Sequence, residues 1–208
     1  MIQPTDWLCI KNHTELPAVT QSTSTMALQG KLSHPKRYIT SHNSDGKAII
    51  DSSVPEEAPF YELPDKVASF ASCYVTREFP VQLNEGTDLK TYQDFLNSPP
   101  GLTVSTGTVL RYVDMGPSIT SPMHRTVSLD YGVVLEGEVE LILDSGETKL
   151  LKRGDICVQR GTMHAWRNTS DKEWARMLYV LQPSTPITVE GKVLGEDYGT
   201  MQGVEASK

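Results

Sequence analysis

Apolar and polar residues alternate with a period of two through much of the second half of the chain. Between residues 138 and 144, Val139 and Leu141 fall on one face of an extended segment, and Glu138 and Glu140 fall on the other. Similar short segments, separated by turn-forming residues, recur as far as residue 182. The pattern predicts an all-β fold with strands at residues 108–115, 130–136, 138–144, 148–152, 155–159, 164–168 and 175–182.

The first half of the chain carries fewer strand signals. Residues 37–40 and 48–53 flank the sequence NSDG, which favours a hairpin turn, and residues 72–81 predict a further strand. Leu89, Tyr92 and Leu96 have helical spacing. They predict a short helix that ends before the Ser-Pro-Pro sequence, because a residue that precedes proline avoids the helical conformation. We therefore expect extra N-terminal strands and one short helix beside the main sheet.

The length of 208 residues suits one domain with a substantial core. Residues 1–35 are rich in Thr, Ser, Gln and Asn and predict a loosely ordered N-terminal arm. Residues 36–183 form the predicted domain with its N-terminal strand extension. Residues 184–208 form a polar C-terminal tail, in which residues 187–194 offer one more edge strand.

Charge and cysteine content narrow the partners and the compartment. The net charge of −7 argues against nucleic acid or an anionic membrane as the main partner, because phosphate binding needs a concentrated basic face. Cys9, Cys73 and Cys157 are an odd number without CxxC spacing, so neither a disulfide framework nor a zinc knuckle is indicated. No signal-peptide or membrane-span pattern is present in the sequence, and we expect a cytoplasmic protein.

Two of the five histidines, His124 and His164, stand at the starts of predicted strands. Asp130 follows His124 by six residues, and this even spacing places both on one face of an extended segment. A lone histidine in a β protein is more often a satisfied polar residue, and Asp130 beside Tyr131 is compatible with a turn cap. Together, however, side chains from distant strands can meet in the mouth of a barrel, which is where such folds hold a small ligand.

Two longer stretches resemble the paired motifs of the cupin family: MHRTVSLDYGVVLEG at residues 123–137 and GDICVQRGTMHAWRN at residues 154–168. The resemblance extends from about residue 36 to residue 182 and is strongest to small cupins of bacteria and of fungal natural-product gene clusters. It implies a single jelly-roll-like antiparallel β-barrel. The positions that match the motifs are His124, Asp130, Gly137, Gly161, His164 and Asn168.

The resemblance also implies a divalent metal, Zn, Fe or Mn, held by His124, Asp130 and His164. The sequence departs from the family pattern at this site, because Thr126 stands where a second histidine is usual and Gln159 replaces a proline. A hydroxyl is a poorer ligand than imidazole. Either Thr126 contributes to the metal site through a water, or the metal is absent and the same three residues form an acid-base set.

Both versions of the site lead to lyase or isomerase chemistry on a small-molecule substrate. We expect dehydration, decarboxylation or cyclisation through an enolate of a polyketide-like or carbonyl- or carboxylate-bearing natural-product intermediate. His124 or His164 would abstract the proton, with Asp130 orienting the imidazole, and Tyr131 or Arg125 would stabilise the oxyanion. The residues expected to line the substrate pocket are Arg111, Met123, Met163 and Trp166.

Two alternative functions stay open from the sequence. Two histidines and one carboxylate are the ligands of non-haem Fe(II) dioxygenases. A cupin can also bind a small molecule without turning it over. For assembly we expect a homodimer, in which the N-terminal strands from Lys36 onward cover or exchange across an exposed sheet edge.

Overall fold

The computed structural model describes residues 32–207, and almost all of the predicted arm at residues 1–35 lies outside them. In chain order the elements are β1 (Ile39–His42), β2 (Ala48–Asp51), β3 (Tyr61–Glu62), β4 (Ser69–Val75), a 3-10 turn (Asn84–Gly86), α1 (Thr87–Asn97), β5 (Val109–Met115), β6 (Ser128–Glu136), β7 (Glu138–Leu143), β8 (Thr148–Lys152), β9 (Ile156–Arg160), β10 (His164–Asn168), β11 (Ala175–Pro183), β12 (Ile187–Val189) and β13 (Lys192–Leu194).

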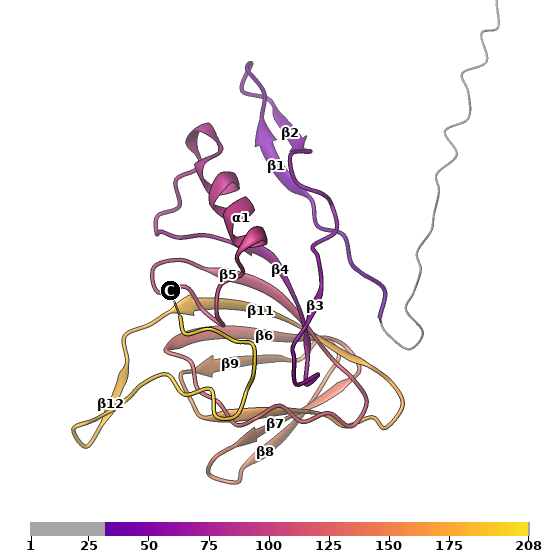
Figure 1. Ribbon diagram of the computed structural model, residues 1–208, viewed down its shortest axis with the longest axis vertical. Coiled ribbons are helices and arrows are strands. Elements are labelled where there is room, and N and C mark those ends of the chain that lie inside the picture. Colours follow the sequence, from indigo (N-terminus) through magenta and orange to yellow (C-terminus); the bar gives the residue numbers. More distant parts are fainter. Residues whose placement is uncertain (1–31, 208) are drawn as a thin grey trace, which may run out of the picture.

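Two antiparallel sheets enclose the core. The larger sheet has the strand order β3-β4-β5-β11-β6-β9, and the smaller has the order β10-β7-β8 (Figure 1). Val134 and Met177 from the larger sheet pack in one buried cluster with Val139 and Trp166 from the smaller. The fold is thus all-β, as the alternating pattern predicts, and it is the barrel that the resemblance of the two motifs implies, with the apolar faces of the two sheets turned toward each other.

The predicted strands of the second half are present, with ends shifted by a few residues. β6 starts at Ser128, which extends the regular alternation toward His124. β3 was not predicted, because it occupies two residues of a proline-bounded connector. The tail forms the hairpin β12–β13 instead of a single edge strand, with Gly191 at a φ of 79° in the turn.

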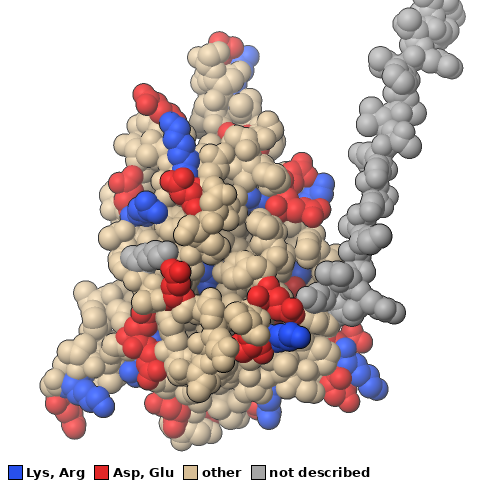
Figure 2. Space-filling model, in the orientation of Figure 1, with Lys and Arg blue, Asp and Glu red and all other residues tan. Residues whose placement is uncertain are grey.

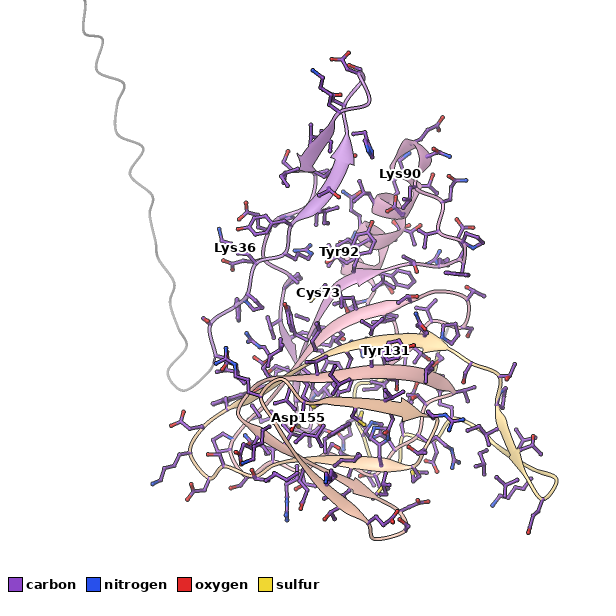
Figure 3. All side chains as sticks on the ribbon, turned by 180° about the vertical axis from the view of Figure 1, so that it is seen from behind. Lys36, Cys73, Lys90, Tyr92, Tyr131 and Asp155 are labelled. Atoms are coloured by element: carbon purple, nitrogen blue, oxygen red, sulfur yellow. The ribbon has the colours of Figure 1, made fainter. Side chains whose placement is uncertain are left out.

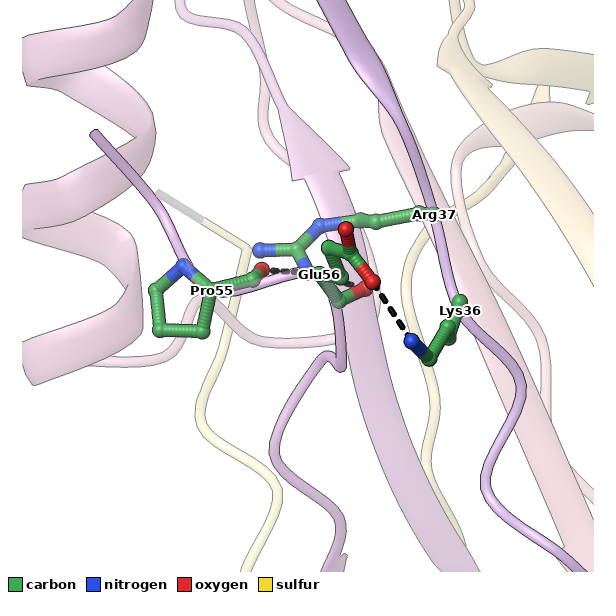
Figure 4. A network of polar contacts seen from close by, with 4 residues as sticks. All are labelled: Lys36, Arg37, Pro55 and Glu56. Carbon is green, nitrogen blue, oxygen red and sulfur yellow. Dashed lines mark hydrogen bonds and ion pairs between the residues drawn. The ribbon is translucent and has the colours of Figure 1, made fainter. Parts of the chain in front are cut away.

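The N-terminal segment and α1 form an outer layer at one end of the larger sheet (Figure 1). The hydroxyl of Tyr92 on α1 donates a hydrogen bond of 2.8 Å to the carbonyl of Ser72 on β4. Near β1, Lys36 Nζ lies 2.7 Å from Glu56 Oε2, and Arg37 Nη1 donates to the carbonyl of Pro55 (Figure 4). The first contact joins α1 to β4, and the other two join the residues before β1 to the connector between β2 and β3.

The last described residues fold back over the barrel, and we call residues 195–207 the C-terminal strap. The backbone of Arg125 exchanges two hydrogen bonds with that of Asp197, at 2.6 and 2.9 Å, and Arg125 Nε donates to the carbonyl of Gly195. Side chains of the strap pack against those near the barrel mouth; the residues in these contacts are Leu63, Phe70, Leu102, Tyr198, Met201 and Val204. The tail of the sequence therefore forms one wall of the fold.

Charged side chains of both signs are interspersed over the face shown in Figure 2, with broad uncharged areas between them. None of the helices among residues 32–207 is long and apolar enough to cross a membrane. Cys73 and Cys157 are free thiols, and Cys9 lies outside the described residues.

Candidate active site

Alternate residues of the segment that leads into β6 point into the barrel. His124, Thr126, Ser128 and Asp130 are each no more than 8% exposed. Tyr131, labelled in Figure 3, lies on the opposite face of β6 and is 38% exposed. The even spacing of His124 and Asp130 thus gives them the same face, and the odd offset of Tyr131 turns it away from the cavity.

His124 and His164 lie directly opposite each other on neighbouring extended segments. Their backbones exchange two hydrogen bonds, of 2.8 and 2.9 Å, and their ring centroids are 4.3 Å apart. Nδ1 of His124 is 2.9 Å from the carbonyl of Pro122, and Nδ1 of His164 is 2.9 Å from the carbonyl of Thr162. Because a carbonyl only accepts, Nδ1 carries the proton in each ring, and Nε2 keeps its lone pair.

Burial keeps both rings neutral. It lowers the pKa of His124, and together with the repulsion that a protonated His124 would exert it lowers the pKa of His164 to about 3. A charged imidazole would lose its hydration in this apolar setting, so the neutral form is favoured. At neutral pH the site contains two uncharged imidazoles.

Asp130 has a buried carboxylate with one engaged oxygen and one free oxygen. Oδ2 accepts a hydrogen bond of 3.3 Å from the hydroxyl of Thr126, which in turn accepts one of 2.7 Å from Ser128. Oδ1 is buried without a hydrogen-bond partner. Burial raises the pKa of Asp130 to about 6, although the hydroxyls and the charge of Arg111 partly oppose the shift.

These groups face one cavity, whose empty volume including its opening is about 650 Å³. Trp166 lies edge-on to His164, with 5.7 Å between the ring centroids. Most of the other lining side chains are apolar, and they come from the connector before β4, the loop before β5, the larger sheet and the strap: Leu63, Val67, Ala68, Phe70, Leu102, Val113, Met115, Leu181 and Met201. Sequence reasoning missed Leu63, Leu102 and Met201, because no local pattern marks a connector or a tail as a cavity wall.

Gly132 makes room for one side chain at the cavity. A Cβ at this position would lie 2.8 Å from Cε1 of Tyr179, which is its partner on β11. A Cβ essentially never approaches another atom so closely, so glycine at this position allows the tyrosine ring to pack directly against β6. Tyr179 in turn lines the cavity beside Arg111, its partner on β5.

Comparison with known proteins agrees with this architecture. A family model described as a cupin domain matches residues 111–181. Phomopsin biosynthesis cluster protein C' of Diaporthe leptostromiformis is 46% identical over 165 residues, which cover 79% of this chain and 87% of the relative. The chain belongs to the cupin family. Another similar cupin is the cupin-domain-containing oxidoreductase virC of Hypocrea virens, 40% identical over 74% of this chain and 78% of the relative.

Among solved structures, the polyketide cyclase RemF from Streptomyces resistomycificus is similar to this cupin, with a TM-score of 0.40 and 16% sequence identity. The match covers 72% of this chain and 82% of that one.

Four of the predicted site residues of this cupin do not line the cavity. Tyr131 points outward, and Arg125 is engaged with the strap through Gly195. Met123 and Met163 are only partly buried, and each precedes an inward-facing histidine. Since neighbours on an extended segment face opposite sides, an inward histidine turns the preceding methionine out. Arg111 and Trp166 do line the cavity.

The arrangement does not fit the expected three-ligand metal site. Two neutral imidazoles with Nδ1 bound to carbonyls are suited to ligation through Nε2. Yet nowhere in residues 32–207 do three His, Cys, Asp or Glu side chains come close enough together to hold a metal ion. Thr126, at the usual position of a second histidine, forms a hydrogen bond with Asp130 instead. Asp130 also forms no hydrogen bond with either histidine, so the backbone carbonyls, and not its carboxylate, orient the rings.

Proposed function

We propose that this cupin is an enzyme of small-molecule biosynthesis that catalyses a lyase or isomerase reaction through an enolate. The observation that carries the proposal is the unpartnered Oδ1 of Asp130, buried in an apolar cavity beside two neutral imidazoles. The names of similar cupins associate them with biosynthesis clusters, which supports a natural-product intermediate as the substrate.

Asp130 is better suited to act as the base than His164. Its carboxylate keeps a free oxygen, and its pKa of about 6 lies close to neutral pH, where a general base works most efficiently. His164, whose pKa is lowered to about 3, is a much weaker base. This reverses the assignment expected from the sequence, in which a histidine abstracts the proton.

In the proposed step, Oδ1 of Asp130 takes a proton from the carbon next to a substrate carbonyl. The electron pair of the broken C–H bond forms a C=C bond, and the carbonyl electron pair moves onto oxygen to give the enolate. If the substrate has a β,γ-double bond, the enolate is conjugated with it, and returning the proton to the γ-carbon while the carbonyl re-forms shifts the double bond and isomerises the substrate. If the substrate has a β-hydroxyl, the carbonyl re-forms, the enolate pair forms the Cα=Cβ bond, the Cβ–O bond breaks, and the hydroxyl leaves as water with the proton from Asp130. Nε2 of His124 and of His164 would accept hydrogen bonds from substrate hydroxyls and orient them.

Hydrogen exchange at the α-carbon of a substrate tests this proposal whatever the final product is. Candidate ketones and oxo acids would be incubated with the protein in D2O, and deuterium at the α-carbon followed by NMR. Asp130→Asn should slow exchange by about 10²–10⁴-fold, the usual contribution of a general base. The control is Asp171→Asn, an exposed aspartate in the loop before β11. Exchange at the same rate in wild type and Asp130→Asn would refute the proposal.

A second candidate function is metal-dependent oxidation. Several similar cupins are named oxidoreductases, and both histidines keep Nε2 free. Metal analysis of the purified protein, combined with oxygen uptake in the presence of candidate substrates, separates the two functions. Stoichiometric iron together with substrate-dependent oxygen uptake would replace the lyase proposal with this one.

A further inference from the structure

Arg111 is a buried cation in the middle of β5. It is 2% exposed, and it lies in a row across the larger sheet between Ser72 on β4 and Tyr179 on β11. Its side chain lines the same cavity as His124 and Asp130. A guanidinium in this position has lost most of its hydration, and burial lowers its pKa from the ordinary value.

The hydrogen bonding of Arg111 is incomplete. Nη2 donates to the carbonyl of Gly101 at 2.7 Å, and the guanidinium carbon lies 4.8 Å from the ring centroid of Phe70. Nε is buried without a partner. Within residues 32–207 no ion pair joins Arg111 to an acidic side chain. Asp130 acts on it electrostatically but lies beyond ion-pair distance.

Arg176, on the adjacent strand β11, is a useful comparison. It is also buried, and its Nε and Nη2 each donate to a different carboxylate oxygen of Asp114, both at 2.6 Å. Its Nη1 donates to the carbonyl of Ser33. One buried arginine of this sheet is therefore fully paired, and the other has donors left over at the cavity wall. A buried charge without a partner is costly, so a structural function alone does not account for Arg111.

We propose that Arg111 binds an anionic group of the ligand, a carboxylate on an otherwise apolar carbon skeleton. The skeleton would lie against the apolar wall formed by Leu63, Phe70 and Leu181, and the carboxylate would accept hydrogen bonds from the unused guanidinium donors. The inference rests on the proposed function for the reaction that follows, but the binding step can be measured separately. It narrows the substrate class from carbonyl compounds in general to oxo acids.

The competing interpretation is that Arg111 serves only to balance the charge of Asp130 through water. The two interpretations differ in how the cavity treats a matched acid and amide. An anion site favours the acid, whereas an internally balanced Arg111–Asp130 pair gives no advantage to an added negative charge.

The test is isothermal titration of the wild-type protein with 4-phenylbutanoate and with 4-phenylbutanamide, which differ only in the charged group. The acid should bind about 10–100-fold more tightly, because hydrogen bonds to charged groups contribute about 1.5–3 kcal/mol. Arg111→Met should abolish the preference and leave the affinity for the amide unchanged, and Arg111→Lys should keep part of it. The control Arg167→Met removes a half-exposed arginine of β10 and should keep the full preference.

Equal affinity of the wild-type protein for acid and amide, or failure of the acid to bind, would overturn the inference, and neither result depends on a variant that folds. The outcome is separate from that of the exchange experiment. A preference for the acid without any hydrogen exchange refutes the enolate reaction and leaves the anion site. Hydrogen exchange without a preference for the acid refutes the anion site and leaves the enolate reaction.

Discussion

Thr126 donates a hydrogen bond to Asp130, with 3.3 Å between Oγ1 and Oδ2, at the position where the first cupin motif usually has a second histidine. The hydroxyl therefore holds in place the carboxylate that we propose as the base. It does not extend a set of metal ligands.

Thr126→His should convert the site into a metal site. The replacement removes the hydrogen bond to Asp130 and adds a third imidazole beside His124 and His164, which supplies the tetrahedral nitrogen ligands that zinc prefers. Zinc affinity measured by competition with a chelating dye should rise at least about tenfold over the wild type. Thr126→Val, which removes the hydroxyl alone, is the matched control. Zinc binding to the wild-type protein as tight as to Thr126→His would contradict this interpretation of Thr126.

Gly203→Ala should loosen the C-terminal strap. A Cβ at Gly203 would lie 2.4 Å from Cδ of Pro64, so the strap has to move away from the barrel. Gly191 has a similar positive φ, 79° against 72°, and nothing within 4 Å of its added Cβ. Gly191→Ala therefore controls for backbone strain of about 1 kcal/mol. Hydrogen-deuterium exchange over residues 195–207 should rise in Gly203→Ala only, and equal rises in both variants would refute the contact.

The stability of the metal-free protein should depend on pH through His164. Its pKa is about 3 in the folded protein against an ordinary 6.5, so between these values the unfolded chain binds more protons than the folded one. The free energy of unfolding contributed by this group is thus complete above pH 6.5 and is lost as the pH falls toward 3. Urea titrations should show a shallower pH dependence for His164→Gln than for the wild type or for the exposed-site control His42→Gln.

Asp130 should affect the pH dependence of stability in the direction opposite to His164. Its pKa of about 6, against an ordinary 3.8, means that the folded protein retains the proton more strongly over that range. The stability it contributes is present below pH 3.8 and declines as the pH rises through 6. Asp130→Asn should therefore steepen the rise in stability between pH 4 and 6, as measured by the same titrations. An unchanged slope would show that the carboxylate is not desolvated.

Asp114→Asn should be strongly destabilising. The change removes the charge that pairs with Arg176 and leaves a buried guanidinium uncompensated, which typically costs about 3–5 kcal/mol. The exposed pair Lys36–Glu56 is the control, since Lys36→Met should leave the melting temperature almost unchanged. Similar decreases in melting temperature in the two variants would show that the buried Asp114–Arg176 pair does not stabilise the packing of β5 against β11.

Alternation along the chain predicted the strands of the second half and placed His124 and Asp130 on one face of an extended segment. The same period argues against Tyr131 as a residue of the cavity, because it follows Asp130 by one residue and therefore lies on the opposite face of β6. What could not be predicted depends on contacts between distant segments, such as the strap that supplies Met201 to the cavity. A hydrogen bond between Thr126 and Asp130 is compatible with their even spacing, but distance and orientation decide it, and a sequence carries neither.

The homodimer stays a prediction. Tyr131, Ile156 and Val158 are exposed on the outer face of β6 and β9, where Tyr131 and Val158 are direct neighbours. Sedimentation of the wild-type protein and of a Val158→Lys variant would test whether a second copy covers this face. A stable monomer at micromolar concentration would count against the dimer.

The central claim is that the cavity contains two neutral imidazoles, each protonated at Nδ1, next to a carboxylate with one free oxygen. The most direct measurement is ¹⁵N NMR of the histidine rings in the metal-free protein at pH 7. We expect His124 and His164 both to show a protonated Nδ1 and an unprotonated Nε2. A charged ring, or a proton on Nε2 of either histidine, would contradict the claim.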